Sequence, residues 1–171
     1  MGEVKAITLW QPWASLVAVG VKKLETRSWY TKHRGSIAIH AAAKSPKLDT
    51  LMDESATLKL INIVYEWCRC TPDALPHGAV IAVANLTECY KVNRHLPGFG
   101  SELDIDLRDH NSGITVSSNS IEYLCGDFLI GRYAWEFKNV VRIAPIPAKG
   151  KQGLWTWEWE DDSDHNKKTM L

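Results

Sequence analysis

The segment 79–86 constrains the fold of this chain more than any other part of the sequence. It reads Ala-Val-Ile-Ala-Val-Ala-Asn-Leu directly after Gly78, and it is apolar on both faces when extended. This pattern is typical of a strand that is buried inside a sheet. We therefore expect a buried strand here, with Thr87 and Glu88 at its far end.

Shorter segments with strand or helix patterns flank this strand. Alternation of apolar and polar residues predicts strands over 25–29, 35–41, 133–143 and 155–159. A short helix is expected after Trp10, because Pro12 suits a first helical position and Gly20 suits the residue just past a helix end. Short strands joined by loops, with helices at the edge, indicate an α+β fold that consists of a small mixed β-barrel flanked by helices.

Length and composition favour one domain. The 171 residues are 45% apolar and 23% charged, and we expect residues 1–160 to form a single domain. A helical insertion is expected at about 45–70, and a long surface loop at about 93–121, where Gly, Asn, Ser and Asp are frequent. Residues 161–171 are charged and are expected to form a disordered tail.

The sequence also predicts where the protein resides and what it does not bind. No apolar run approaches the roughly 20 residues needed to cross a bilayer, and the first residues lack the apolar stretch of a signal peptide. We expect a cytoplasmic protein without a membrane partner. Cys68, Cys70 and His77 do not have the spacing of a zinc site, and the four cysteines are too irregularly spaced for a disulfide framework. Reduced thiols, no metal and no cofactor are therefore expected.

The net charge of zero hides an uneven distribution of charge along the chain. Residues 1–47 carry a net charge of +6 and residues 132–151 carry +4, so the rest of the chain carries −10. If the two basic segments adjoin in the fold, they form a positive face, which is typical of proteins with a phosphate-bearing partner. The alternative is that these lysines and arginines only solvate one side of the domain.

One stretch stands apart, the eight residues from Gly20 to Arg27, which have the form G-x-K-x-x-E-x-R. The motif Trp-Gln-Pro-Trp-Ala at 10–14 precedes it, and Ile-His-Ala at 39–41 follows it. Further matching segments lie at 142–150 and 153–155, whereas residues 44–131 match only loosely. With these motifs the chain resembles the ASCH family, a branch of the PUA-like superfamily.

The resemblance implies a PUA-like β-barrel with a groove between the first helix and the barrel, where RNA or a nucleoside-like ligand binds. The residues at that location fit this expectation, because arginine can hold phosphate bidentately and lysine acts as a point charge. An unpaired base could stack on Trp10, Trp29, Tyr133 or Trp135. The expected ligand-binding residues are Gln11, Lys23, Arg27, Trp29, His40, Tyr133 and Lys149.

Each expected role has a purely structural alternative. Glu25 and Arg27 lie two residues apart on one strand face, so they could form an ion pair that pins the strand to the barrel. His40 could be a hydrogen-bonded core histidine. Lys149 could belong to a solvated loop. The sequence leaves these alternatives open.

An enzyme is the alternative to a binding protein. Some ASCH relatives are amidohydrolases of acylated cytidine that use a lysine, a threonine and a glutamate, and an N4-acylcytidine amidohydrolase-like reaction here would use Lys22 and Glu88. Glu25 stands where the threonine is expected, and Thr26 is one position late, which turns its hydroxyl to the other face of a strand. Glu25 could instead activate a water.

The expected catalytic residues are therefore Lys22, Glu25 and Glu88. A third possibility is ribonuclease activity, which is also found in the family. Lys22 would then act with Tyr30 or Tyr133 on the 2′-hydroxyl of RNA. We expect RNA or nucleotide binding first, hydrolysis of a modified nucleoside second and RNA cleavage third.

Overall fold

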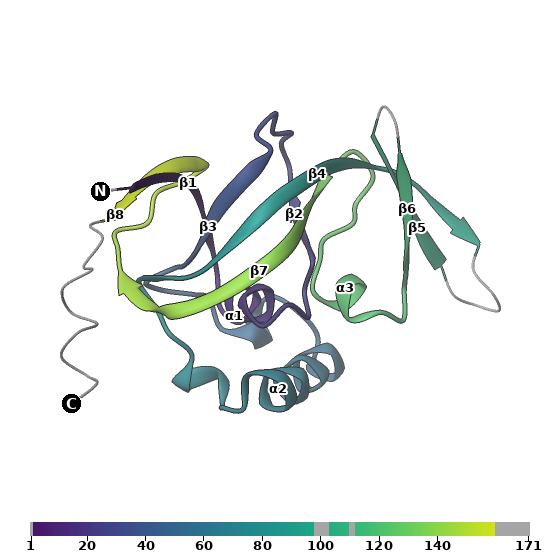
Figure 1. Cartoon of the computed structure of the whole chain (residues 1–171). Coiled ribbons are helices and arrows are strands. Elements are labelled where there is room, and N and C mark those ends of the chain that lie inside the picture. Colours follow the sequence, from purple (N-terminus) through teal and green to yellow (C-terminus); the bar gives the residue numbers. More distant parts are fainter. Residues whose placement is uncertain (1, 98–102, 110–111, 160–171) are drawn as a thin grey trace.

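A curled sheet forms the framework of the protein (Figure 1). The computed structural model describes residues 2–97, 103–109 and 112–159. The strands are β1 (Gly2–Leu9), β2 (Leu24–Arg27), β3 (Gly35–Ala41), β4 (Ala79–Pro97), β5 (Leu103–Arg108), β6 (Gly113–Ser117), β7 (Tyr133–Pro147) and β8 (Leu154–Trp159). The helices are α1 (Trp13–Ala18), α2 (Glu54–Cys68) and α3 (Ile121–Leu124), with 3-10 turns η1 (Leu48–Thr50) and η2 (Pro72–Ala74).

The strand β4 is the centre of the sheet. The order of the main path is β2-β7-β4-β3-β1-β8, and β4 pairs antiparallel with both β3 and β7. The strands β1 and β3 are parallel, whereas β1 and β8 are antiparallel. Val80, Ala82 and Leu86 of β4 are fully buried. The buried strand and the α+β class with a small mixed barrel, expected from the sequence, are thus confirmed.

The short helix α1 fills the inside of the curled sheet. Ala14 and Val17 pack in one apolar cluster with Ile37 and Ile39 of β3 and with Trp135 of β7. The helix ends where the chain turns at Gly20, whose φ of +78° is a conformation that favours glycine. Pro12 is the residue just before the first helical position, one place earlier than expected.

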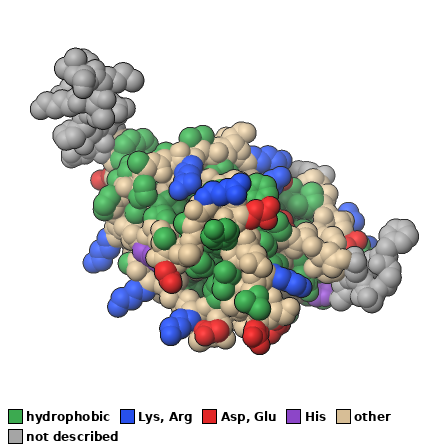
Figure 2. All heavy atoms as spheres, turned by 90° about the horizontal axis from the view of Figure 1, so that it is seen from below, with side chains coloured by type: hydrophobic (Ala, Val, Ile, Leu, Met, Phe, Trp, Pro, Cys, Tyr) green, Lys and Arg blue, Asp and Glu red, His purple; other side chains and the backbone are tan. Residues whose placement is uncertain are grey.

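The longer helix α2 covers α1 from outside the barrel (Figure 1). Its N-terminus is capped by Asp53, whose carboxylate accepts the backbone N–H of Ala56. Leu60 and Val64 face inward and pack against Leu16 of α1. This helix lies within the segment 45–70 where the helical insertion is expected. From below, the same side of the molecule shows hydrophobic side chains in the middle and charged side chains around them (Figure 2).

The expectation of a long loop at 93–121 is wrong. There β4 continues to Pro97 and pairs antiparallel with β5, and β5 pairs antiparallel with β6, so that the three strands extend the sheet at one end of the barrel (Figure 1). Ile105 and Leu107 are buried in an apolar cluster, and the side chains of Arg94 and Arg108 neutralise the buried carboxylate of Asp106. The polar composition of this segment suggested a loop, but its charged side chains pair with each other within the sheet.

Three remaining expectations concern segments and residue types. The tail expected over 161–171 lies outside the described residues. All four cysteines are free thiols. Within residues 2–97, 103–109 and 112–159, no helix combines the length and the apolar character that crossing a bilayer requires.

We predict that truncation of a buried side chain on the face of the sheet that packs against α1 strongly lowers the free energy of unfolding. Ile39 is fully buried, and Ile39→Ala should lower the free energy of unfolding by about 2–5 kcal/mol because it leaves a cavity in the main core. Leu58 of α2 is 56% exposed, and Leu58→Ala should change the same quantity by less than about 0.5 kcal/mol. Urea unfolding followed by circular dichroism measures both values. Equal destabilisation of the two variants would contradict this description of the core.

Candidate functional site

A cleft with a volume of about 1040 Å³ opens beside α1. Its lining comes from six stretches of chain that are distant in sequence. These are the end of β1 with the start of α1, the strand β2 with the two residues after it, the end of β3 with the residues up to 43, residues 51–52, the segment around 124–132, and the loop 148–153 after β7. The barrel thus brings the two basic segments of the sequence to one cavity.

An ion-paired carboxylate lies in the wall of this cleft. The Oε1 atom of Glu25 is 3.1 Å from Nε of Arg27, and its Oε2 atom is 3.5 Å from Nζ of Lys22. Lys22 is fully buried, and its ammonium donates a hydrogen bond to the carbonyl of Leu24. A buried ammonium needs such partners, because desolvation of an unpaired charge is expensive. Glu25 therefore lies between a buried cation and a partly exposed one.

A second carboxylate, that of Glu122, interacts electrostatically with the buried lysine. Glu122 of α3 accepts the backbone N–H groups of Lys23 and Leu24, the latter at 3.1 Å. Burial raises the pKa of Glu122, and the positive charge of Lys22 partly opposes this shift. The short helix α3 is thereby fastened to the turn that precedes β2.

The next polar group along the cleft is a histidine. Nη2 of Arg27 donates to the carbonyl of Thr8 at 2.9 Å, and Thr8 is the register partner of His40 in the parallel pair β1 and β3. Nε2 of His40 lies 3.0 Å from the carbonyl of Ala148, and burial lowers the pKa of this imidazole. A neutral ring that donates from Nε2 has an acceptor at Nδ1. That atom is buried and has no hydrogen-bond partner among the described residues.

Cations and tryptophans complete the lining. Arg132 pairs with Asp127 at 3.2 Å, whereas Lys149 and Lys151 form no ion pair within the described residues. Three tryptophans line the same cleft, and Trp10 is 51% exposed. The ring of Trp29 packs edge-on against the buried Trp135, with 4.6 Å between centroids. Flat apolar surfaces and positive charges thus occur together.

Five of the residues proposed from the sequence line the cleft. They are Glu25, Arg27, Trp29, His40 and Lys149. The geometry places the ion pair of Glu25 and Arg27, which was one of the open alternatives, inside this cavity, so the pair can be structural and still contact a ligand. His40 is hydrogen-bonded and buried, and it too reaches the cleft wall.

The other five proposed residues do not line the cleft. Lys22 is enclosed behind Glu25, and the side chain of Lys23 is exposed elsewhere. The amide of the buried Gln11 is used internally, because it donates to Ser15 Oγ and to the carbonyl of Pro76. Tyr133 packs edge-on against Tyr30.

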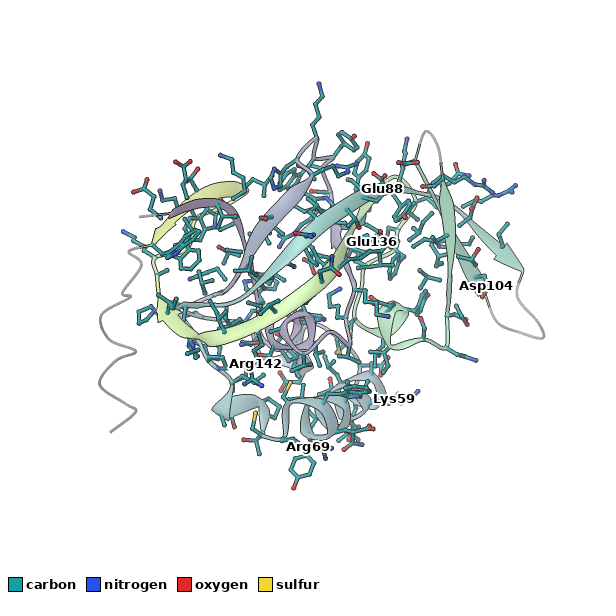
Figure 3. All side chains as sticks on the ribbon, in the orientation of Figure 1. Lys59, Arg69, Glu88, Asp104, Glu136 and Arg142 are labelled. Carbon is teal, nitrogen blue, oxygen red and sulfur yellow. The ribbon has the colours of Figure 1, made fainter. Side chains whose placement is uncertain are left out.

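The fifth residue, Glu88, is part of another cluster. Its carboxylate pairs with Arg34, and its register partner on β7 is Glu136 (Figure 3). The described side-chain contacts of Lys22 are with Leu24 and with Glu25, so Lys22 lies beside another expected catalytic residue and not beside Glu88. The hydroxyl of Thr26 accepts the N–H of Asp127 at 2.9 Å. Of the three expected catalytic residues, Lys22 and Glu25 thus lie together, and Glu88 lies in a separate cluster with Arg34.

Several lining residues were not proposed from the sequence. Thr8 lies at the cleft because of the pairing of β1 with β3. Asp127 and Arg132 lie there because the segment between α3 and β7 packs against β2. No local pattern distinguishes them. Lys151 could be recognised from the sequence as a candidate, since it lies two residues after Lys149 in the loop that follows β7. No group of three or more metal-ligating side chains occurs in the part of the chain that the structure describes.

Similar proteins were found by sequence. A family model described as the ASCH domain matches residues 7–147. Activating signal cointegrator 1 from Homo sapiens is 35% identical over 86 residues, which are 48% of this chain and 14% of that protein. Activating signal cointegrator 1 from Mus musculus is 29% identical over 119 residues, which are 68% of this chain and 19% of that protein. The chain spans less than a fifth of the length of either relative.

We predict that the buried imidazole makes stability sensitive to acid. Because the pKa of His40 is lower in the folded protein, the unfolded chain takes up a proton first as the pH falls below about 6.5. The free energy of unfolding should therefore fall between pH 7 and pH 5, and His40→Gln should reduce this slope.

Urea unfolding at several pH values measures the slope. The control is Leu58→Ala, because Leu58 is 56% exposed and carries no titratable group. That variant should keep the wild-type slope. A His40→Gln slope identical to that of the wild-type protein would contradict the assignment of a buried neutral ring.

Proposed function

Because this chain belongs to the ASCH domain family, we propose that it binds single-stranded RNA through the cleft beside α1. The observation that carries the proposal is the combination of three tryptophans with four basic side chains in one open cavity. An RNA strand needs both features, since its bases offer flat apolar faces and its backbone is negatively charged.

The charge of the cleft supports a phosphate-bearing ligand. Arg27, Arg132, Lys149 and Lys151 line it together with only two carboxylates, those of Glu25 and Asp127. Both carboxylates are already paired with the arginines, so the two lysines are available for the phosphates of a ligand. The lysines lie on the loop 148–153, where flexible side chains can follow a backbone.

The aromatic side chains support an unpaired base. Trp10 presents half of its surface, and Trp29 is held in place by its contact with Trp135. Stacking of a base on such a ring contributes roughly 1–3 kcal/mol. A base in a duplex is already stacked on its neighbours and cannot enter a cleft, which favours single strands.

Binding agrees with the geometry better than hydrolysis does. A hydrolase of a modified nucleoside needs a base or nucleophile that contacts the substrate. Of the expected catalytic residues only Glu25 lines the cleft, and each of its carboxylate oxygens already faces a cation. Lys22 is enclosed by protein, and Glu88 is paired with Arg34. Tyr30 and Tyr133, considered for RNA cleavage, pack against each other instead of lining the cleft.

We predict that the loop lysines determine the salt dependence of binding. A double variant, Lys149→Ala with Lys151→Ala, should bind a labelled single-stranded RNA more weakly. The slope of log K against log salt concentration should decrease by about 0.7 for each phosphate that the variant no longer neutralises. Fluorescence anisotropy at several NaCl concentrations measures both quantities. Lys59→Ala, on the outer side of α2 (Figure 3), is the control and should leave the slope unchanged.

We also predict that Trp10 contributes by stacking. Trp10→Ala should weaken RNA binding by roughly 5- to 150-fold, the equivalent of one stacked base. The control is Trp67→Ala, because Trp67 on α2 is 47% exposed and does not line the cleft. An absence of binding by the wild-type protein at low salt, or equal affinities of both tryptophan variants, would refute RNA binding through this cleft.

A further inference from the structure

The outward side of α2 carries an apolar stripe that is largely exposed. Leu58, Ile61 and Tyr65 are spaced by three and four residues, which places them along one side of the helix. Leu58 is 56% exposed and Tyr65 is 66% exposed, whereas Ile61 between them is partly buried. The inward side of the same helix packs against α1 through Leu60 and Val64. A helix that is apolar on two sides is typical of one that is covered on both.

A charged side chain stands at each end of this stripe, one acidic and one basic. Glu54 lies four residues before Leu58 in the first turn of α2, and Arg69 lies four residues after Tyr65 at the C-terminal cap. Both are exposed, and neither forms an ion pair within the described residues. A stripe with opposite, unpaired charges at its two ends is complementary to a copy of itself that runs in the reversed direction.

A second copy of α2 supplies this reversed stripe. When two α2 helices pack antiparallel about a two-fold axis that passes between them beside Ile61, Leu58 of one copy lies opposite Tyr65 of the other. Glu54 of one copy then lies opposite Arg69 of the other. Because such an interface is isologous, each contact occurs twice. A parallel arrangement would bring like charges together at both ends, so the charges favour the antiparallel one.

Two further charges flank the stripe on one side. Lys59 and Glu66 directly follow Leu58 and Tyr65, so they share one flank of the helix and are about two turns apart. Both are exposed, and neither has an ion-pair partner in the part of the chain that the structure describes. The reversed direction of the second helix brings Lys59 of one copy toward Glu66 of the other.

We propose that the protein forms a weak symmetric dimer in which the α2 helices of two copies pack antiparallel through this stripe. Figure 2 shows this side of the molecule, where hydrophobic side chains in the middle are surrounded by charged ones, as in a protein–protein interface. One pair of helices makes a small interface, so the dissociation constant is on the order of 10–100 µM. At about 1 µM the monomer therefore predominates. No residue of α2 lines the cleft, so the dimer leaves both clefts uncovered by this helix.

Sedimentation velocity over a range of protein concentrations tests the dimer. The weight-average mass of the wild-type protein should rise from that of one chain toward twice that value between about 1 µM and about 500 µM. Leu58→Glu should remain at the mass of one chain throughout, because it places an acidic side chain in the apolar stripe. The matched control is Leu129→Glu, because Leu129 is 65% exposed in the segment between α3 and β7. That variant should associate like the wild-type protein.

A mixture of two charge variants tests the antiparallel pairing without Leu58→Glu. In a dimer of Glu54→Arg, like charges face each other at both ends of the stripe, and the same is true of a dimer of Arg69→Glu. Each variant alone should therefore associate at least about 10-fold more weakly than the wild-type protein. In the equimolar mixture, each end of the mixed dimer has one basic and one acidic side chain again. The mixture should associate about as tightly as the wild-type protein.

Every result of these experiments supports or overturns the dimer. A wild-type mass that stays at one chain over the whole range overturns it. Association of Leu58→Glu equal to that of the wild-type protein, or loss of association in Leu129→Glu, overturns the assignment to α2. A mixture that associates no better than its two components overturns the antiparallel pairing. Far-ultraviolet circular dichroism verifies that each variant retains the native secondary structure.

Discussion

The buried ammonium of Lys22 is the interaction on which the edge of the barrel depends. A lysine with no exposed surface has to be compensated, and three groups do so, two from β2 and one from α3. The carbonyl of Leu24 belongs to β2, the carboxylate of Glu25 faces the cleft, and Glu122 comes from α3. The position of one charge therefore couples the turn after α1, the outer strand and the segment that covers it.

Apolar patterns predicted the interior of the fold well. The strand 35–41 coincides with β3, and the apolar segment at 79–86 is the first part of β4. These patterns succeed because burial on one or both faces leaves a direct mark on the order of residues. The extension formed by β5 and β6 was not predicted, because polar residues such as Asp106 are buried there with charged partners. A search for apolar residues does not detect buried polar ones.

The candidate site was predictable only where neighbours along the chain are also neighbours in space. Glu25 and Arg27 are paired, as their spacing on one strand indicated. Lys22 precedes the strand, so alternation does not define its direction, and it turns inward to Glu25. Glu88 has its partner, Arg34, on the segment before β3, and nothing in the local sequence indicates that pairing.

The cleft is lined both by strands and by connecting segments. Its floor, with Glu25, Arg27 and His40, stands on strands whose register is set by their neighbours in the sheet, and its rim is made by the segments around 124–132 and 148–153. Insertions and deletions in loops are tolerated far better than shifts in strand register. A change in the length or charge of these rim segments should therefore leave the side chains of Glu25, Arg27 and His40 in place, whereas a one-residue shift in β2 or β3 would turn them away from the cleft.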